Sequence, residues 1–159
     1  MIPNASLSLV ILLIVAVVLF YLALTDFKHY KIRNDVILLL VVLFFVHALL
    51  SGRWANIPWN IGFSLFILAI LIYLYSQNLL GGGDVKLLAV ALLWVGLDCA
   101  LPFALLLLIF TAIHALAARL GWVGSQQIGD DDRPRIAFAP SVAAALIGTF
   151  MLGCLHPAP

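Results

Sequence analysis

The stretch that decides the fold is the apolar run from Ala5 to Thr25, ASLSLVILLIVAVVLFYLALT, which contains no charged side chain. A helix needs about 20 mostly apolar residues to cross the hydrocarbon core of a bilayer, so this run predicts a membrane-spanning helix. The whole chain has the same character, because 65% of its 159 residues are hydrophobic and 9% are charged. A soluble domain is about half apolar and about a quarter charged, so we expect the lipid bilayer to cover this protein.

Four further runs are apolar enough to cross the membrane or nearly so. They are Val36 to Leu50, Trp59 to Tyr75, Cys99 to Leu120 and Ile136 to Leu155. Asn34 and Asp35 are candidate caps for the first of these, and Asn56 with Pro58 makes a natural helix start for the second.

A sixth run, Val85 to Leu97, is apolar but short. It reaches spanning length only if it begins near Gly81, which brings Asp84 and Lys86 to the membrane boundary. A carboxylate at membrane depth is costly and usually functional. The alternative is a short buried helix, which would leave five spans.

The distribution of basic residues favours six spans, because Lys and Arg concentrate in cytoplasmic loops. With six spans and the N-terminus outside, one side of the membrane carries Arg53 alone. The other side carries Lys28, Lys31, Arg33, Lys86, Arg119, Arg133 and Arg135. We therefore predict an all-α, polytopic integral membrane protein with six transmembrane helices and both termini outside. Residues 1–159 are expected to form a single membrane-embedded domain, with 121–135 as a solvated cytoplasmic loop.

Two aspartates stand out in a chain that has no glutamate. Asp26 follows the first predicted span, and Asp84 follows three glycines at the start of the fourth. The predicted topology places both at the cytoplasmic face. Two carboxylates that approach closely share one proton, so one can take a proton from water while the other polarises a peptide carbonyl. Glycine before the second carboxylate would let a substrate main chain approach.

Structural explanations compete with this chemistry. Asp26 could be an interfacial residue paired with Lys28 or Arg33, and Asp84 could be a helix N-cap with Lys86 extending toward the headgroups. His47 and His114 lie inside predicted spans, too far from other ligand types to bind a metal. The two cysteines, Cys99 and Cys154, are not in a C-x-x-C pair. A structural disulfide is one alternative, and burial as small apolar residues is the one we expect. No metal, cofactor or nucleic-acid partner is expected, because the basic residues form no stripe.

One motif resembles a known family. The sequence Gly81-Gly82-Gly83-Asp84-Val85-Lys86 resembles the GxGDxK motif of type IV prepilin peptidases, which are GxGD membrane aspartyl proteases. In that family the first aspartate is followed six residues later by Ile-Pro-Asn, and Asp26 is followed at that spacing by Ile32-Arg33-Asn34, with arginine where proline is usual. The stretch 136–141 is similar to the family's proline-containing start of the last helix.

The resemblance implies that Asp26 and Asp84 are a catalytic dyad, and that Gly81, Gly83, Lys86 and Asn34 bind substrate or support the motif. The chain lacks the C-x-x-C insertion of the larger members, which also methylate their product, and so is similar to the minimal Flp (Tad) pilus type. The implied substrate is a prepilin or pseudopilin, whose leader is cut at the cytoplasmic face of the bacterial inner membrane. The pilus assembly machinery would be a further partner.

Two other functions are open at this point. A non-catalytic component of a pilus or secretion machine would tolerate Asp26→Asn and Asp84→Asn. A small proton-coupled carrier would use both aspartates as relay groups, although the sequence shows no duplicated half and few charges deep in its spans.

Overall fold

The computed structural model describes residues 5–29, 32–52, 54–120 and 137–153. The described chain is helical and contains no strand. Its elements are α1 (Ala5–His29), α2 (Asn34–Leu50), the short 3₁₀ helix η1 (Trp54–Asn56), α3 (Ile57–Ser76), α4 (Gly82–Val95), α5 (Ala100–Arg119) and α6 (Ala139–Met151). The six α-helices correspond to the six predicted runs, which confirms the all-α fold. α1 extends beyond its predicted end, so Asp26 lies in its last turn and not after it.

Three of the described helical segments are long and apolar enough to cross a bilayer: Leu7–Lys28, Trp54–Ser76 and Ala100–Arg119. Their mean hydropathies are 3.2, 2.0 and 2.3, and α2 and α6 are shorter apolar helices. Large apolar side chains point outward on the long helices, with Val17 68%, Phe66 65% and Leu108 67% exposed. So much outward-facing apolar surface requires lipid around it, and the chain is a polytopic membrane protein.

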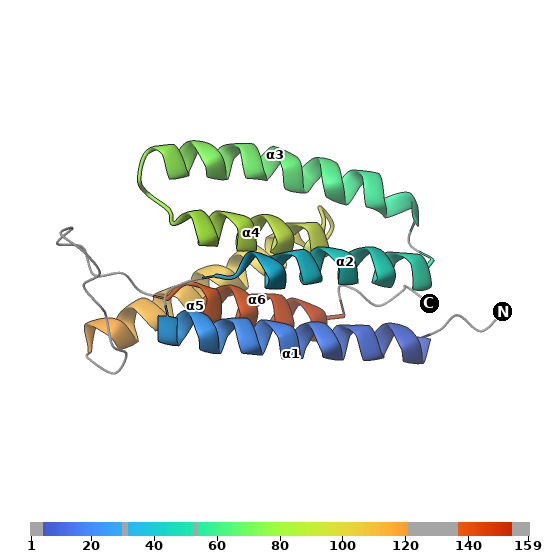
Figure 1. Cartoon of the computed structure of the whole chain (residues 1–159), viewed down its shortest axis with the longest axis horizontal. Coiled ribbons are helices and arrows are strands. Elements are labelled where there is room, and N and C mark those ends of the chain that lie inside the picture. The colour runs from blue at the N-terminus through green and yellow to red at the C-terminus, as the bar shows by residue number, and fades with distance from the viewer. Residues whose placement is uncertain (1–4, 30–31, 53, 121–136, 154–159) are drawn as a thin grey trace.

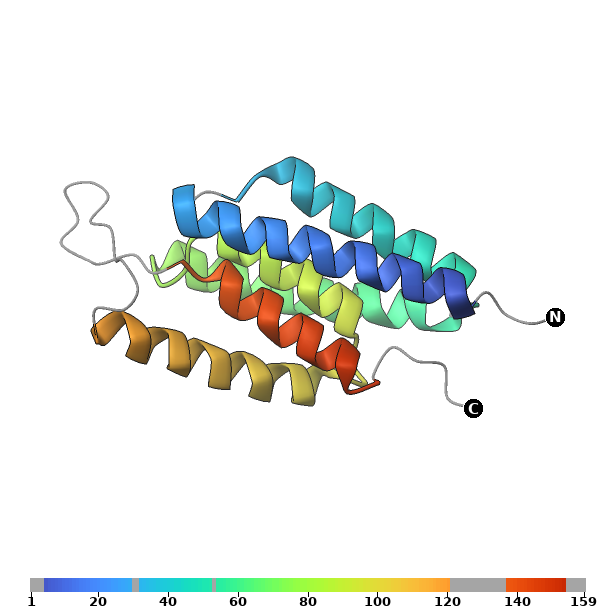
Figure 2. The same ribbon diagram turned by 90° about the horizontal axis from the view of Figure 1, so that it is seen from below.

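Successive helices run in opposite directions along the bundle (Figure 1). As a result, the C-terminal ends of α1, α3 and α5 lie at the same end as the N-terminal ends of α2, α4 and α6, and the view from below agrees (Figure 2). We call this the aspartate end, because it holds Asp26 in the last turn of α1 and Asp84 in the first turn of α4. The opposite end holds the first turns of α1, α3 and α5.

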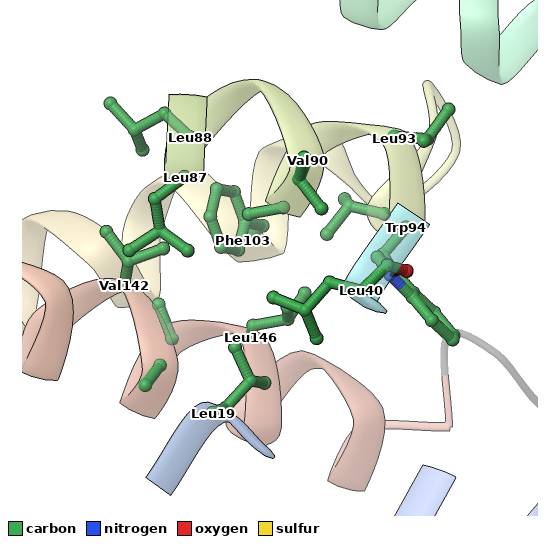
Figure 3. Packing of buried hydrophobic residues seen from close by; sticks show 14 of the residues in the cluster. Leu19, Leu40, Leu87, Leu88, Val90, Leu93, Trp94, Phe103, Val142 and Leu146 are labelled. Carbon is green, nitrogen blue, oxygen red and sulfur yellow. Dashed lines mark hydrogen bonds between the residues drawn. The ribbon is translucent and has the colours of Figure 1, made fainter. Parts of the chain in front are cut away.

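The core is formed around α4 and α6, the two shortest helices. α4 packs against α2, α3 and α6, and α6 packs against α1, α4 and α5. Figure 3 shows Leu87, Trp94, Val142 and Leu146 meeting Leu19 and Leu40 in this core. Fourteen residues of α4 span about 21 Å at 1.5 Å per residue, which is less than the roughly 30 Å hydrocarbon core. Such short helices are tolerated because protein surrounds them.

Side-chain hydrogen bonds to main-chain carbonyls fix α4 within this core. The indole Nε1 of Trp94 donates to the carbonyl of Leu40 at 3.0 Å. On the other side, the Ser64 hydroxyl of α3 donates to the carbonyl of Ala89 at 2.7 Å. Water is scarce at this depth, so each bond satisfies a polar group that would otherwise be costly.

The predicted helix starts are correct in one case and wrong in another. α3 has Asn56 as its N-cap and Pro58 in its first turn, as expected. For α2 the N-cap is Arg33, with no side-chain capping bond, so Asn34 and Asp35 are not caps. Instead the Asp35 carboxylate accepts a hydrogen bond from the Arg33 guanidinium at 3.0 Å. An acidic residue in the first turn still favours the helix through its dipole.

Cys99 precedes α5 at the end opposite the aspartates. It is buried, as expected, and it is also disulfide-bonded, which is the alternative that the sequence left open. Cys154 lies outside the described residues, as does most of the expected loop at 121–135.

The orientation of the bundle in the membrane can be tested by labelling. In a chain whose two native cysteines are changed to alanine, Gln77→Cys reports on the aspartate end and Trp54→Cys on the opposite end. Both residues are exposed; Trp54 precedes α3 and Gln77 follows it. We expect an impermeant maleimide to label Trp54→Cys in intact spheroplasts and Gln77→Cys only after lysis, because four described basic residues lie at the aspartate end. Labelling of Gln77→Cys from outside would contradict this orientation.

Candidate active site

Asp26 is held by the start of α6. Its side chain is 5% exposed, and its Oδ2 accepts a hydrogen bond of 3.0 Å from the main-chain N–H of Ala139. Ala139 is the first residue of α6, so its N–H has no partner within the helix. One buried acceptor and one unused donor therefore satisfy each other, although they are far apart in the sequence.

The α6 start suits a carboxylate for a second reason. The partial positive charge at a helix N-terminus attracts negative groups, and the effect is larger where water is excluded. Proline follows Ala139 at position 140, where the missing N–H costs nothing in the first turn. This turn thus presents the N–H of Ala139 to Asp26.

Asp84 is in the first turn of α4, whose N-cap is Gly81. Its side chain is partly buried and turns back over the N-cap. A Cβ at Gly81 would lie 2.9 Å from the Asp84 Oδ2, closer than real Cβ contacts. Glycine at 81 thus leaves room for the observed position of the carboxyl group. Because Asp84 is the third helical residue, the alternative of an N-cap aspartate is wrong.

The two remaining glycines of the motif face different neighbours. A Cβ at Gly83 would lie 3.2 Å from the Cβ of Ile32, so this glycine lets the α1–α2 connection pack closely on α4. A Cβ at Gly82 would lie 3.4 Å from the ring of Tyr75, which is an ordinary contact. The expected approach of a substrate to Gly83 remains a prediction, and packing against Ile32 supplies a structural reason for the same residue.

Asn34 and Lys86 meet although they are distant in the sequence. The Lys86 ammonium donates to the Asn34 Oδ1 at 3.0 Å on an exposed surface. Together with the contact between Ile32 and Gly83, this bond ties the start of α2 to the start of α4. These motif residues therefore connect the segment that follows Asp26 to the helix that carries Asp84.

The proposed pairing of Asp26 with Lys28 or Arg33 is not observed. Within the described chain the recorded ion pair is Arg33 with Asp35, and both side chains are exposed. Among the same residues, no group of three His, Cys or Asp side chains is arranged to hold a metal ion. A cavity of about 30 Å³ lies away from both aspartates, toward the opposite end, and is lined by Phe44, His47, Ala48, Asn56, Ile57, Asn60 and Trp94.

Sequence reasoning missed the contacts at the start of α6: the N–H of Ala139, which donates to Asp26, and the pair of Ser141 and His114. The His114 Nδ1 lies 3.3 Å from the Ser141 hydroxyl. Only the proline-containing stretch at 136–141 pointed toward this part of α6.

The glycines give a graded test of this geometry. In Gly81→Ala the new methyl group would displace the Asp84 carboxyl, so we expect prepilin cleavage to fall at least about tenfold, since small misplacements of reacting groups are costly. The fold should persist, because the extended backbone at this N-cap (φ −75°, ψ 144°) is open to alanine. Thermal unfolding in detergent and a leader-cleavage assay measure the two effects.

Gly82→Ala is the matched control, because its methyl group would meet only the edge of Tyr75. Cleavage and thermal stability should stay close to those of the wild type. Equal cleavage by Gly81→Ala and Gly82→Ala would show that the Asp84 position does not depend on the space at Gly81.

Comparison with known proteins identifies the family. The family model described as the type IV leader peptidase family matches residues 13–116. The match contains Asp26, Asn34, Asp84 and Lys86 and ends before α6. Searches of curated proteins and of solved structures returned no match. Since the matched segment covers more than half of the chain, this membrane protein belongs to the type IV leader peptidase family and is a peptidase.

Proposed function

We propose that the protein removes the leader of Flp-type prepilins or pseudopilins at the cytoplasmic face of the bacterial inner membrane, with Asp26 and Asp84 as the catalytic dyad. The observation that carries the proposal is that the last turn of α1, which contains Asp26, and the first turn of α4, which contains Asp84, lie at the same end of the bundle (Figures 1 and 2). Residues 1–159 would act as one membrane-embedded peptidase domain. The Flp-type substrate rests on the resemblance to the minimal members of the family.

The distribution of charge supports the cytoplasmic orientation of the aspartate end. This end carries Lys28, Arg33, Lys86 and Arg119. Basic residues near membrane spans favour the cytoplasmic side. The disulfide-bonded Cys99 lies at the opposite end, and disulfides persist in oxidising compartments outside the cytoplasm. The two arguments agree.

The proposed reaction needs one proton shared between two carboxyls. The ionised carboxylate takes a proton from water, and the water oxygen attacks the scissile carbonyl carbon. The protonated carboxyl donates to the carbonyl oxygen. As the C–N bond breaks, a carboxyl returns a proton to the departing amine, which yields a free acid and a new N-terminus.

The other two functions fit the structure less well. A proton carrier needs ionisable groups along a path across the membrane, whereas the buried ionisable side chains of the described chain are Asp26 and His47, near opposite ends of the bundle. A non-catalytic assembly component would not require a carboxyl at either position. It therefore predicts normal growth of pili when both aspartates are replaced.

Replacement of the aspartates is the central test. Asp26→Asn or Asp84→Asn should lower leader cleavage at least about a thousandfold, and the double variant should be no worse, because residues that act as a unit are not additive. The assay is the mobility shift of a co-expressed Flp-type prepilin. Membrane levels of each variant are measured in parallel.

Asp35→Asn and Asp98→Asn are the matched controls, since both residues are exposed. We expect both variants to cleave at rates close to wild type. Normal processing by either Asp26→Asn or Asp84→Asn at equal membrane level would overturn the two-aspartate mechanism.

A further inference from the structure

Helix α5 carries two buried polar atoms that have no hydrogen-bond partner. These are the Oγ1 of Thr111 and the Nε2 of His114, and no other such atoms are found in the described chain. They lie three residues apart, which places them on the same face of the helix. A buried polar group without a partner costs free energy and calls for an explanation.

The position of this pair points to the aspartate site. The other ring nitrogen of His114 contacts the hydroxyl of Ser141 in the first turn of α6. That same turn donates the N–H of Ala139 to Asp26. Thr111 and His114 therefore lie at the interface between α5 and α6, next to the turn that holds Asp26.

α5 lies at the edge of the bundle, with α6 as its main partner and a slight contact with α4. Its one buried side chain is Phe103, near its first turn. From residue 104 to 119 every side chain is partly or largely exposed, and in a membrane helix these side chains face lipid. Because lipid and the protein interior favour the same apolar side chains, the half of α5 that carries Thr111 and His114 can exchange its contacts with α6 for contacts with lipid.

We propose that Thr111 and His114 form a polar subsite, uncovered when α5 moves off α6, that hydrogen-bonds the main chain of the substrate peptide beside Asp26. The inference rests on the proposed function. A peptide that enters from the lipid must satisfy its N–H and C=O groups within the protein. A hydroxyl both donates and accepts, and Nε2 does one or the other depending on the tautomer. Such contacts recognise any peptide main chain, independent of side chains.

The test separates substrate binding from folding. Thr111→Val removes the hydroxyl with little change of shape, so KM for a synthetic peptide spanning the cleavage site of a Flp-type prepilin should rise about three- to tenfold, as expected for one lost hydrogen bond. Thermal stability should stay equal or rise, because the unsatisfied hydroxyl is gone. Thr111→Ser keeps the hydroxyl and should retain a KM near that of the wild type.

Thr149→Val is the matched control on α6. Thr149 is fully buried, but its hydroxyl already donates to the Ala145 carbonyl at 2.8 Å. Its replacement should lower thermal stability slightly and leave KM unchanged. If the Thr111 hydroxyl does not contact the substrate, Thr111→Val should likewise leave KM unchanged.

A main-chain variant of the substrate completes the test. A peptide in which a single amide is replaced by an ester loses one N–H. At one position of the peptide this replacement should raise KM for the wild-type enzyme. The same replacement should cause no further rise in KM for Thr111→Val or for His114→Phe, because the bond is already lost there. Unchanged KM in both enzyme variants would overturn the subsite. Asp26→Asn is assayed in parallel: undiminished cleavage there would overturn the dyad, whereas a raised KM in Thr111→Val would still support the subsite.

Discussion

The hydrogen bond from the Ala139 N–H to the Asp26 carboxyl is the interaction on which the arrangement of the site depends. A carboxyl group in a membrane helix has few ways to be satisfied, because lipid offers no donors. Here the donor is the unused N–H at the first residue of α6. This bond fixes the last turn of α1 against α6 and makes the last helix part of the site.

A second constraint is the close packing of α4 within the bundle. α4 is shorter than the membrane is thick, and it is buried along most of its length. Its glycines then have separate steric reasons: Gly81 leaves space for the Asp84 carboxyl, and Gly83 admits Ile32 from the α1–α2 connection. The exposed hydrogen bond between Lys86 and Asn34 joins the same two segments, the start of α2 and the start of α4. The motif around Asp84 therefore has a role in helix packing as well as a proposed role in catalysis.

The outer helices α3 and α5 each pack mainly on one partner, α3 on α4 and α5 on α6. Both leave most of their side chains facing lipid. For the proposed substrate, a helix at the edge of the bundle that packs on α6 would offer a route to a carboxyl that is otherwise buried. The unsatisfied atoms of Thr111 and His114 lie at the interface between α5 and α6.

The amino-acid sequence by itself determined the six helices, their alternating direction and the common end of Asp26 and Asp84. The length of an apolar run must match the thickness of the bilayer, and basic residues favour one side of it, so both properties can be taken from the sequence alone. Its errors concerned helix ends: the N-cap of α2 is Arg33, and α1 continues through Asp26 to His29. Only the tertiary structure decided that Ala139 holds Asp26, that His114 reaches Ser141 and that Lys86 meets Asn34. These partners lie 113, 27 and 52 residues apart, and no periodicity in an apolar chain indicates which helix faces which, since lipid and protein interior favour the same side chains.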